Sequence, residues 1–193
     1  MKRIYQTFEK PMLISFIGSL ILFSCGGDDG DSDPRNEVEV ITTLNITFTA
    51  LTGGTGTEIV SFRDLDGVGG NPPQVDDILL ENGALYTMKL ELLNESEDPP
   101  VDITLEVRKE DDEHQFFFTG SVIDNGSLEV EYNDRDGNGN PLGLANAITT
   151  QSATLGTFIV TLKHQPDGSK VADPVDITVC DIDIEVTFDV AIQ

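Results

Sequence analysis

The chain is 193 residues long and strongly acidic, with 35 Asp and Glu residues against 11 Lys and Arg and a formal net charge of −24. Such a charge argues against binding nucleic acid or an anionic membrane surface through electrostatic attraction, and it favours the attraction of cations. The length suits one folded domain with a sizeable apolar core.

The N-terminus has the features of a secretory leader. Basic residues precede an apolar run, residues 12–23, which ends at Ser24 and Cys25. A helix that crosses about 30 Å of hydrocarbon needs roughly 20 apolar residues, so this run is too short to be a membrane span. We therefore predict a signal peptide at residues 1–24.

The end of this leader resembles a bacterial lipobox. In Leu22-Phe23-Ser24-Cys25 the signal would be cut before the cysteine, which is then acylated. Phe23 stands where a small residue is usual, so secretory cleavage near Ser24 without lipidation is the alternative. Two or more acyl chains on Cys25 would anchor the protein stably to a membrane. Cys180, in a strand-like run, would then have no cysteine partner, and the fold would not depend on a disulfide.

Residues 25–37 are rich in Gly, Asp and Ser and contain no large apolar residue to bury. This composition predicts a disordered acidic tether. Acidic residues directly after a lipidated cysteine also resemble the export signal of Bacteroidetes lipoproteins. We therefore expect the folded domain, residues 38–193, to be carried at the outer membrane, on its periplasmic or cell-surface face.

Residues 38–193 alternate apolar and polar side chains with period two, and no helical period is evident. The alternation is typical of half-buried strands and occurs in the runs 46–50, 90–92, 103–107, 128–130, 158–162 and 182–188. Turn residues such as Asn82-Gly83 and Asn125-Gly126 separate the runs. The pattern predicts a single all-β domain, an antiparallel, immunoglobulin-like β-sandwich of roughly seven to nine strands. A lipocalin-like barrel is the alternative.

Residues 110–118 read EDDEHQFFF, four acids followed by a histidine, a glutamine and three phenylalanines. In an extended strand His114 shares one face with Phe116 and Phe118, while Phe117 points the other way. Apolar residues on both faces are typical of a strand in the middle of a sheet. We therefore expect a central strand that is preceded by a solvated acidic turn.

The two histidines, His114 and His164, each lie at the end of a predicted strand and in register with an apolar face. If these strands are neighbours, the histidines with Asp112 or Glu113 would form a transition-metal site of nitrogen and oxygen ligands. Two unrelated histidines hydrogen-bonded to their surroundings are the simpler alternative, since no HxxxH or CxxC spacing is present.

Two similar loops, residues 64–72 and 134–141, both contain DxDGxG with Asn-Pro behind it. The second loop has four side-chain oxygens at alternate positions, on Asp134, Asp136, Asn138 and Asn140. Oxygens of this kind on a Gly-flexed loop suit Ca²⁺, although neither loop has the acid that an EF-hand needs at its twelfth position. Asp-Gly also occurs in ordinary hairpin turns, so the second loop is a candidate calcium site with a structural turn as the alternative.

No catalytic motif supports an enzyme. The chain lacks a Gly-x-Ser-x-Gly elbow, a phosphate-binding loop, an HExxH pair and a dinucleotide fingerprint. Its carboxylates are scattered over turns, where solvation explains them. We therefore expect a non-enzymatic protein.

Several stretches together resemble a group of small Bacteroidetes lipoproteins of unassigned biochemical role, above all DEHQFFF at residues 112–118 and LKHQP at residues 162–166. The resemblance implies that His114 and His164 are family features. It also makes a TonB-dependent outer-membrane receptor, beside which some members lie, a candidate partner. Members of the group are sometimes labelled as a type 1 periplasmic binding fold. That two-lobed fold alternates strands and helices over about twice this length, whereas hairpin-length turns join the strands here, so we do not expect it.

These features favour a non-enzymatic outer-membrane lipoprotein whose acidic domain captures a cation, either Ca²⁺ or a transition-metal ion, or assists a transport receptor. The alternative is a surface interaction or adhesion module in which the Asp-Gly loops only shape turns.

Overall fold

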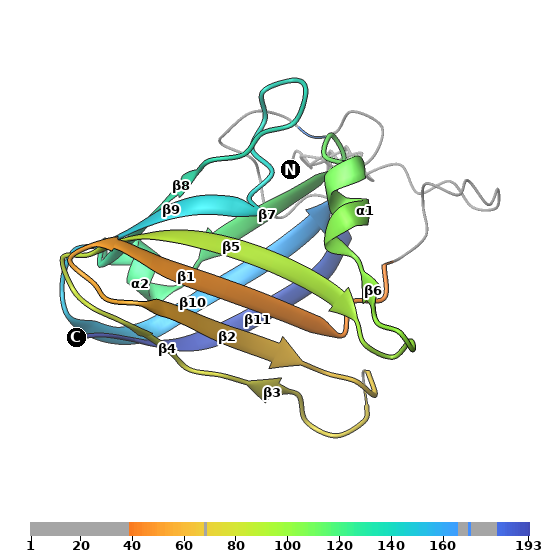
Figure 1. Cartoon of the computed structure of the whole chain (residues 1–193), viewed down its shortest axis with the longest axis horizontal. Helices are drawn as coiled ribbons and strands as arrows, with labels where there is room; N and C mark the ends of the chain where they lie inside the picture. Colours follow the sequence, from red (N-terminus) through yellow and green to blue (C-terminus); the bar gives the residue numbers. More distant parts are fainter. Residues whose placement is uncertain (1–38, 68, 166–169, 171–180) are drawn as a thin grey trace, which may run out of the picture.

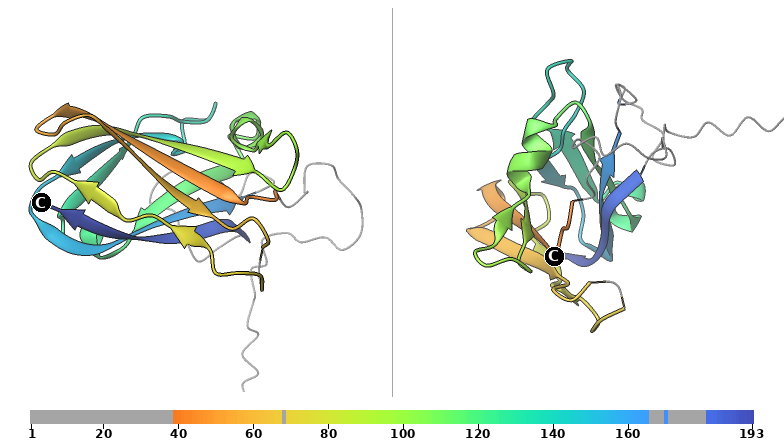
Figure 2. Two further views of the ribbon diagram at one scale, coloured as in Figure 1. Left: turned by 60° about the horizontal axis from the view of Figure 1, so that its bottom comes forward. Right: turned by 90° about the vertical axis from the view of Figure 1, so that its right-hand side faces the viewer.

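Two β-sheets lie in separate layers and face each other across an apolar core (Figures 1 and 2). The computed structural model describes residues 39–67, 69–165, 170 and 181–193. The predicted signal peptide, the tether with Cys25, and Cys180 lie outside these residues. The prediction of an all-β sandwich is confirmed, and the sheets do not close into the lipocalin-like alternative.

The larger sheet has seven strands, and all their pairings are antiparallel. Its strands are β1 (Thr43–Thr52), β2 (Thr57–Arg63), β3 (Gln74–Val75), β5 (Leu85–Asn94), β6 (Val101–Asp102), β8 (Leu128–Tyr132) and β9 (Ala145–Thr150). Their order is β3-β2-β1-β5-β9-β8, and β6 pairs with β5 beside this path.

The smaller sheet has four strands in the order β4-β11-β10-β7. They are β4 (Ile78–Leu80), β7 (His114–Thr119), β10 (Thr154–His164) and β11 (Asp181–Ile192). β4 runs parallel to β11, while the other pairings are antiparallel. The described residues form eleven strands in all. This exceeds the predicted seven to nine because β3, β4 and β6 have only two or three residues each, too few for a visible alternation.

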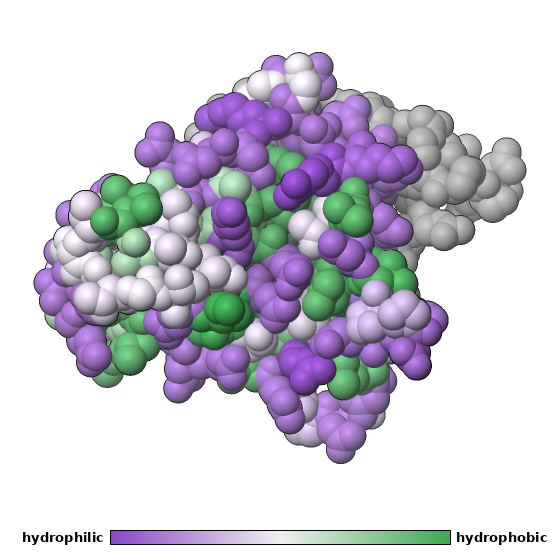
Figure 3. All heavy atoms as spheres, viewed as in Figure 1, coloured by the Kyte–Doolittle hydropathy of each residue, from purple (hydrophilic) through white to green (hydrophobic). Residues whose placement is uncertain are grey.

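The core consists of the inward-facing residues of both sheets. The predicted alternation is confirmed in the central strands, whose buried residues include Leu44, Ile46, Phe48, Leu90, Leu92, Phe158, Val160 and Leu162. Burying each such side chain stabilises the fold by roughly 1.5–3 kcal/mol. The outer face over the larger sheet is mainly hydrophilic with scattered apolar residues (Figure 3).

The run 103–107 is helical, so the prediction of a strand there is wrong. Helix α1 (Thr104–Lys109) begins directly after β6, where Asp102 Oδ1 accepts the Thr104 N–H at 3.0 Å. Ile103 and Val107 are both buried, while Leu105 between them is 63% exposed. Two apolar side chains four positions apart, such as Ile103 and Val107, fit a helix as well as a strand. A strand would place Leu105 on the same face as these two, so its exposure indicates a helix.

A second, one-turn helix, α2 (Ser121–Asp124), follows β7. Among the described residues, neither helix is long and apolar enough to cross a bilayer.

β7 is an edge strand, so the prediction of a central position is wrong. It pairs with β10 and ends the order of the smaller sheet. The segment that follows the 134–141 loop covers its other edge, where the Phe116 N–H donates to Leu142 O and the Tyr132 hydroxyl donates to Phe116 O, both at 2.8 Å. This cover explains why a phenylalanine-rich strand sits at the end of a sheet.

Gly120, between β7 and α2, occupies a position that only glycine tolerates. Its φ is 109°, and a Cβ there would lie 2.4 Å from Thr157 O. We expect Gly120→Ala to lower the free energy of unfolding by about 3 kcal/mol in urea denaturation, from backbone strain and the clash together. Gly56 has a φ of 72° and open space for a Cβ, so Gly56→Ala should cost about 1 kcal/mol. Equal losses of unfolding free energy in Gly120→Ala and Gly56→Ala would show that the clash at Gly120 contributes nothing.

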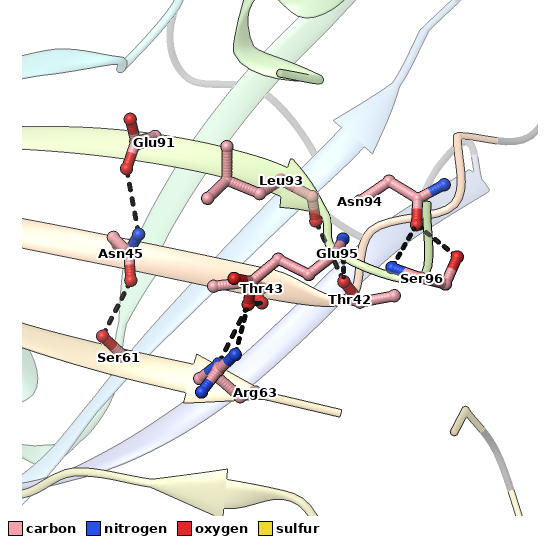
Figure 4. A network of polar contacts seen from close by, with 10 residues as sticks. All are labelled: Thr42, Thr43, Asn45, Ser61, Arg63, Glu91, Leu93, Asn94, Glu95 and Ser96. Atoms are coloured by element: carbon pink, nitrogen blue, oxygen red, sulfur yellow. Dashed lines mark hydrogen bonds and ion pairs between the residues drawn. The ribbon is translucent and has the colours of Figure 1, made fainter. Parts of the chain in front are cut away.

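A polar network fixes the beginning of β1 (Figure 4). Glu95 Oε2 accepts hydrogen bonds from the Thr43 hydroxyl at 2.6 Å and from Arg63 Nε at 2.9 Å. The Thr43 hydroxyl and the Arg63 guanidinium together hold the pKa of Glu95 below its usual range. Thr42 accepts the Glu95 N–H at 2.8 Å with its hydroxyl oxygen, so the chain is firmly held from Thr42 onward.

Candidate metal centre

Three elements meet at one end of the sandwich, beside α1: the segment that leads into β1, the start of β7 and the start of β11 (Figure 1). They contribute Glu39, His114 and Asp183 respectively. The ligand atoms of these residues all lie within 4.8 Å of one another. The His114 side chain is 0% exposed and the two carboxylates are 6% exposed, so the cluster is enclosed by protein.

His114 stands between the two carboxylates. Its Nε2 is 3.2 Å from Glu39 Oε1 and 3.7 Å from Asp183 Oδ2. Its Nδ1 is 3.1 Å from the Glu110 carbonyl oxygen, in the turn before β7. When Nδ1 carries a proton and donates it to that carbonyl, the Nε2 lone pair faces the carboxylates. Metal-binding histidines are commonly oriented by such a backbone carbonyl.

A β-bulge in β11 turns Asp183 inward. Leu162 of β10 pairs with Ile184, but the next residue, Lys163, pairs with Ile182, so Asp183 is an extra residue in the ladder. Regular alternation would point Ile182 into the core and Asp183 outward. Instead Ile182 is 53% exposed and the Asp183 carboxylate is enclosed. Bulges commonly redirect a side chain in this way at functional sites.

The cluster has more negative than positive charge. Burial, and then the Glu39 carboxylate, raise the pKa of Asp183 to about 6. Burial alone would lower the pKa of His114, but Glu39 overrides it and the pKa of His114 is raised. Glu39 Oε2, His114 Nε2 and Asp183 Oδ2 have no hydrogen-bond partner among the described residues. Unpaired buried oxygens are costly, and a cation would satisfy them.

The spacing and the donor types fit a first-row divalent ion. Ligands at about 2.1 Å from a tetrahedral ion lie about 3.4 Å apart. The two His114 contacts, 3.2 and 3.7 Å, bracket that value. An imidazole nitrogen with two carboxylate oxygens suits Zn²⁺, Mn²⁺ or Fe²⁺ better than Ca²⁺, which prefers oxygens alone.

His164 lies next to this cluster in a different role. The condition set for a shared site, that the two histidine strands are neighbours, is met, because β7 and β10 pair with His114 opposite His164. The rings stack with centroids 4.7 Å apart and planes 5° from parallel. Parallel rings cannot both point a lone pair at one ion, so in this arrangement His164 is not a co-ligand. Its Nε2 lies 3.5 Å from Glu113 Oε2 instead.

The residues predicted to form one transition-metal site therefore lie in two separate groups. His114 is joined by Glu39 and Asp183, which the sequence did not single out, while His164 and Glu113 form a neighbouring pair. The only signal for Glu39 was its place at the start of the folded domain. Asp183 showed none, because the bulge reverses its predicted direction.

The four predicted calcium ligands lie in the loop between β8 and β9. Asp136 Oδ1 accepts the backbone N–H groups of Asn138 and Asn140, both at 2.8 Å, and its Oδ2 is 3.3 Å from Lys170 Nζ. The Asp134 carboxylate accepts two further backbone N–H groups. The loop thus already satisfies its carboxylates, and the lysine ammonium supplies positive charge. Calcium binding here stays a prediction and would compete with these contacts.

The other Asp-Gly loop is held in a similar way. Asp66 Oδ2 accepts the backbone and side-chain N–H groups of Asn71 at 3.0 and 2.7 Å, and Asp64 Oδ1 accepts the Gly67 N–H at 3.0 Å. Such contacts are typical of Asp turns.

We expect Lys170→Met to cost about 2 kcal/mol of unfolding free energy at pH 7, because it leaves the buried Asp136 carboxylate without its counter-ion. Burial raises the pKa of Asp136, but the Asn140 N–H and Lys170 override it, and the pKa is lowered below 3.8. A carboxyl with a lowered pKa stabilises the fold above its unfolded value and loses that contribution as the pH falls. The deficit should therefore shrink toward pH 3 in urea titrations, whereas Lys89→Met, at an exposed site on β5, should show none at either pH.

Comparisons of the chain with protein-family models, with curated proteins and with solved structures found no match. The resemblance to Bacteroidetes lipoproteins therefore stays a prediction. The case for a metal centre depends on the geometry of Glu39, His114 and Asp183.

Proposed function

We propose that the chain is a non-enzymatic lipoprotein of the outer membrane whose β-sandwich captures a divalent transition-metal ion at Glu39, His114 and Asp183. The observation that carries the proposal is the meeting of three enclosed ligand groups from three separate elements, each with a buried atom that has no hydrogen-bond partner among the described residues. Solvation does not explain these carboxylates, in contrast to those on the surface turns.

The energetics of the cluster favour a bound ion. Two buried carboxylates with one imidazole leave a net negative charge even when His114 is protonated. Desolvated like charges destabilise a fold unless a cation or a proton neutralises them. A divalent ion supplies this neutralisation and makes a bond to each of the three ligand atoms.

The rest of the chain suits ion capture at a membrane. An acyl anchor on Cys25 and a tether at residues 25–37 would let the domain move near the membrane surface. The net charge of −24 would raise the local concentration of cations around it. A TonB-dependent outer-membrane receptor is the proposed partner, to which the captured ion would pass.

Calorimetric titration of the full chain in mild detergent, after removal of bound metals, tests the proposal. We expect one Zn²⁺ ion per chain, with Mn²⁺ as a second probe. His114→Ala and Asp183→Asn should each weaken Zn²⁺ binding at least about 100-fold, since each removes one of three ligands. His164→Ala should weaken binding by less than about tenfold, because His164 only stacks on the ligand ring.

Asp181→Asn is the matched control. It removes one carboxylate from the same end of β11, but Asp181 is exposed and lies outside the cluster. It should bind Zn²⁺ like the wild type. If the metal-free wild type takes up no Zn²⁺, or if Asp181→Asn weakens binding as much as Asp183→Asn, ion capture at this centre is wrong.

A further inference from the structure

We infer that the bound ion latches the N-terminal segment Glu39–Thr42 across the end of the sandwich, so that ion loading is transmitted to the chain before Glu39. This inference rests on the proposed function, because it takes Glu39 to be a ligand of the ion. It adds a mechanical consequence that ion capture alone does not require.

The ligands come from different layers. His114 and Asp183 belong to β7 and β11 of the smaller sheet, whereas Glu39 belongs to the segment that leads into β1 of the larger sheet. The end view in Figure 2 shows this segment running between the two layers. An ion bound to all three residues would therefore bridge the sheets at this end.

The ladder of the larger sheet holds the segment only from Thr42 onward. The Thr42 N–H donates to Leu93 O at 3.0 Å, and Thr42 O accepts the Asp64 N–H at 2.8 Å. Within the described part of the chain, residues 39–41 make no backbone–backbone hydrogen bond. Val40 is 57% exposed, and Ile41 packs only partly against the core. The side chain of Glu39 is thus the outermost attachment of the segment.

The two carboxylates differ in their freedom to move. Asp183 is fixed by the ladder on either side of the bulge in β11. Glu39 is held by its 3.2 Å contact with His114 Nε2. Without an ion the two carboxylates repel each other, and Glu39 is the one whose backbone can yield. With an ion, the release of Glu39 would break a metal–oxygen bond.

Amide hydrogen exchange tests the latch, with short labelling times on the full chain in mild detergent. Saturating Zn²⁺ should slow exchange of the Thr42 amide, which donates to Leu93 O, at least about tenfold, because fraying of the segment from the sheet then requires loss of a ligand. The Ser121–Asp124 amides in α2 serve as an internal reference and should not change.

Glu39→Gln separates the latch from ion capture. This variant keeps His114 and Asp183, so it should still bind Zn²⁺, more weakly, and should be studied at a concentration that saturates it. Its Thr42 amide should exchange at the ion-free rate, whereas Asp181→Asn should behave as the wild type does.

The possible failures are distinguishable. If Zn²⁺ binds to the wild type but leaves exchange at the Thr42 amide unchanged, the latch is wrong and ion capture stands. If Zn²⁺ slows exchange equally in saturated Glu39→Gln, the latch through Glu39 is also wrong. If calorimetry detects no Zn²⁺ binding at all, the proposed function fails and the latch fails with it.

Discussion

Asp183→Asn is expected to stabilise the ion-free protein by about 2 kcal/mol at pH 7.5 while it weakens ion binding at least about 100-fold. Burial and the Glu39 carboxylate raise the pKa of Asp183 from 3.8 to about 6. Each pKa unit corresponds to about 1.4 kcal/mol between the two protonation states, so ionised Asp183 costs the fold about 2–3 kcal/mol. Asparagine removes that cost and can donate its N–H to Glu39.

The pH dependence gives the sign of the effect. The pKa of Asp183 is higher in the folded chain than in the unfolded chain, so protonated Asp183 stabilises the fold. This contribution is complete below pH 3.8. That contribution is lost as the pH rises from 3.8 to about 6. Between pH 3.8 and about 6 the free energy of unfolding of Asp183→Asn should therefore rise relative to that of the ion-free wild type. The difference should persist at higher pH.

Thermal unfolding of both proteins at pH 4 and pH 7.5 checks this prediction, with Asp181→Asn as the control for charge alone. Saturation with Zn²⁺ should reverse the order at pH 7.5, since an ion at 100 times its Kd stabilises the wild type by about 2.7 kcal/mol. A variant that is less stable than the ion-free wild type at pH 7.5 would refute the expectation. Removing a buried charge to gain stability at the expense of binding is a common trade-off at functional sites.

Phe116→Ala is expected to cost about 4 kcal/mol of unfolding free energy, the largest effect predicted for a single side chain here. Phe116 is fully buried in the core between the sheets. It also lies two residues from His114 on the same face of β7, so its loss would loosen the support of the candidate metal centre. Urea denaturation measures the loss, and calorimetry at a permissive temperature would show weaker Zn²⁺ binding.

Phe118→Ala provides the comparison. Phe118 is only partly buried, although its ring lies 5.7 Å from Phe158 and 5.6 Å from Tyr132. We expect it to cost about 2 kcal/mol, roughly half the cost of Phe116→Ala, and to leave Zn²⁺ affinity unchanged within about threefold. A greater loss at Phe118 than at Phe116 would contradict the burial seen on this face of β7.

Much of the fold follows from alternation in single strands. Residues 158–164 keep one face throughout β10, so His164 stays in phase with Leu162, as predicted. The alternation does not distinguish a five-residue strand from a short helix, which is why α1 was missed. It also does not give the order of strands in a sheet, and the edge position of β7 depends on its contact with the segment near Leu142.

The candidate metal centre was predicted only in part, for a similar reason. His114 was identified, and the site was made conditional on the His114 and His164 strands being neighbours, a pairing that depends on regular registers. The other two ligands depend on irregular features. Asp183 faces inward only because of the bulge, and Glu39 lies outside any strand, next to a segment predicted to be a tether. Ring orientation, which separates stacking from shared ligation, is not encoded in strand periodicity.

The covering of β7 blocks one route to self-association. A strand with three adjacent phenylalanines would be a template for sheet-to-sheet aggregation if its outer edge were free. In the folded chain the Phe116 N–H and carbonyl are already taken by Leu142 and Tyr132. At the opposite edge, β4 has only three residues. Mutations that displace the Leu142 segment would therefore threaten solubility before they affected the core.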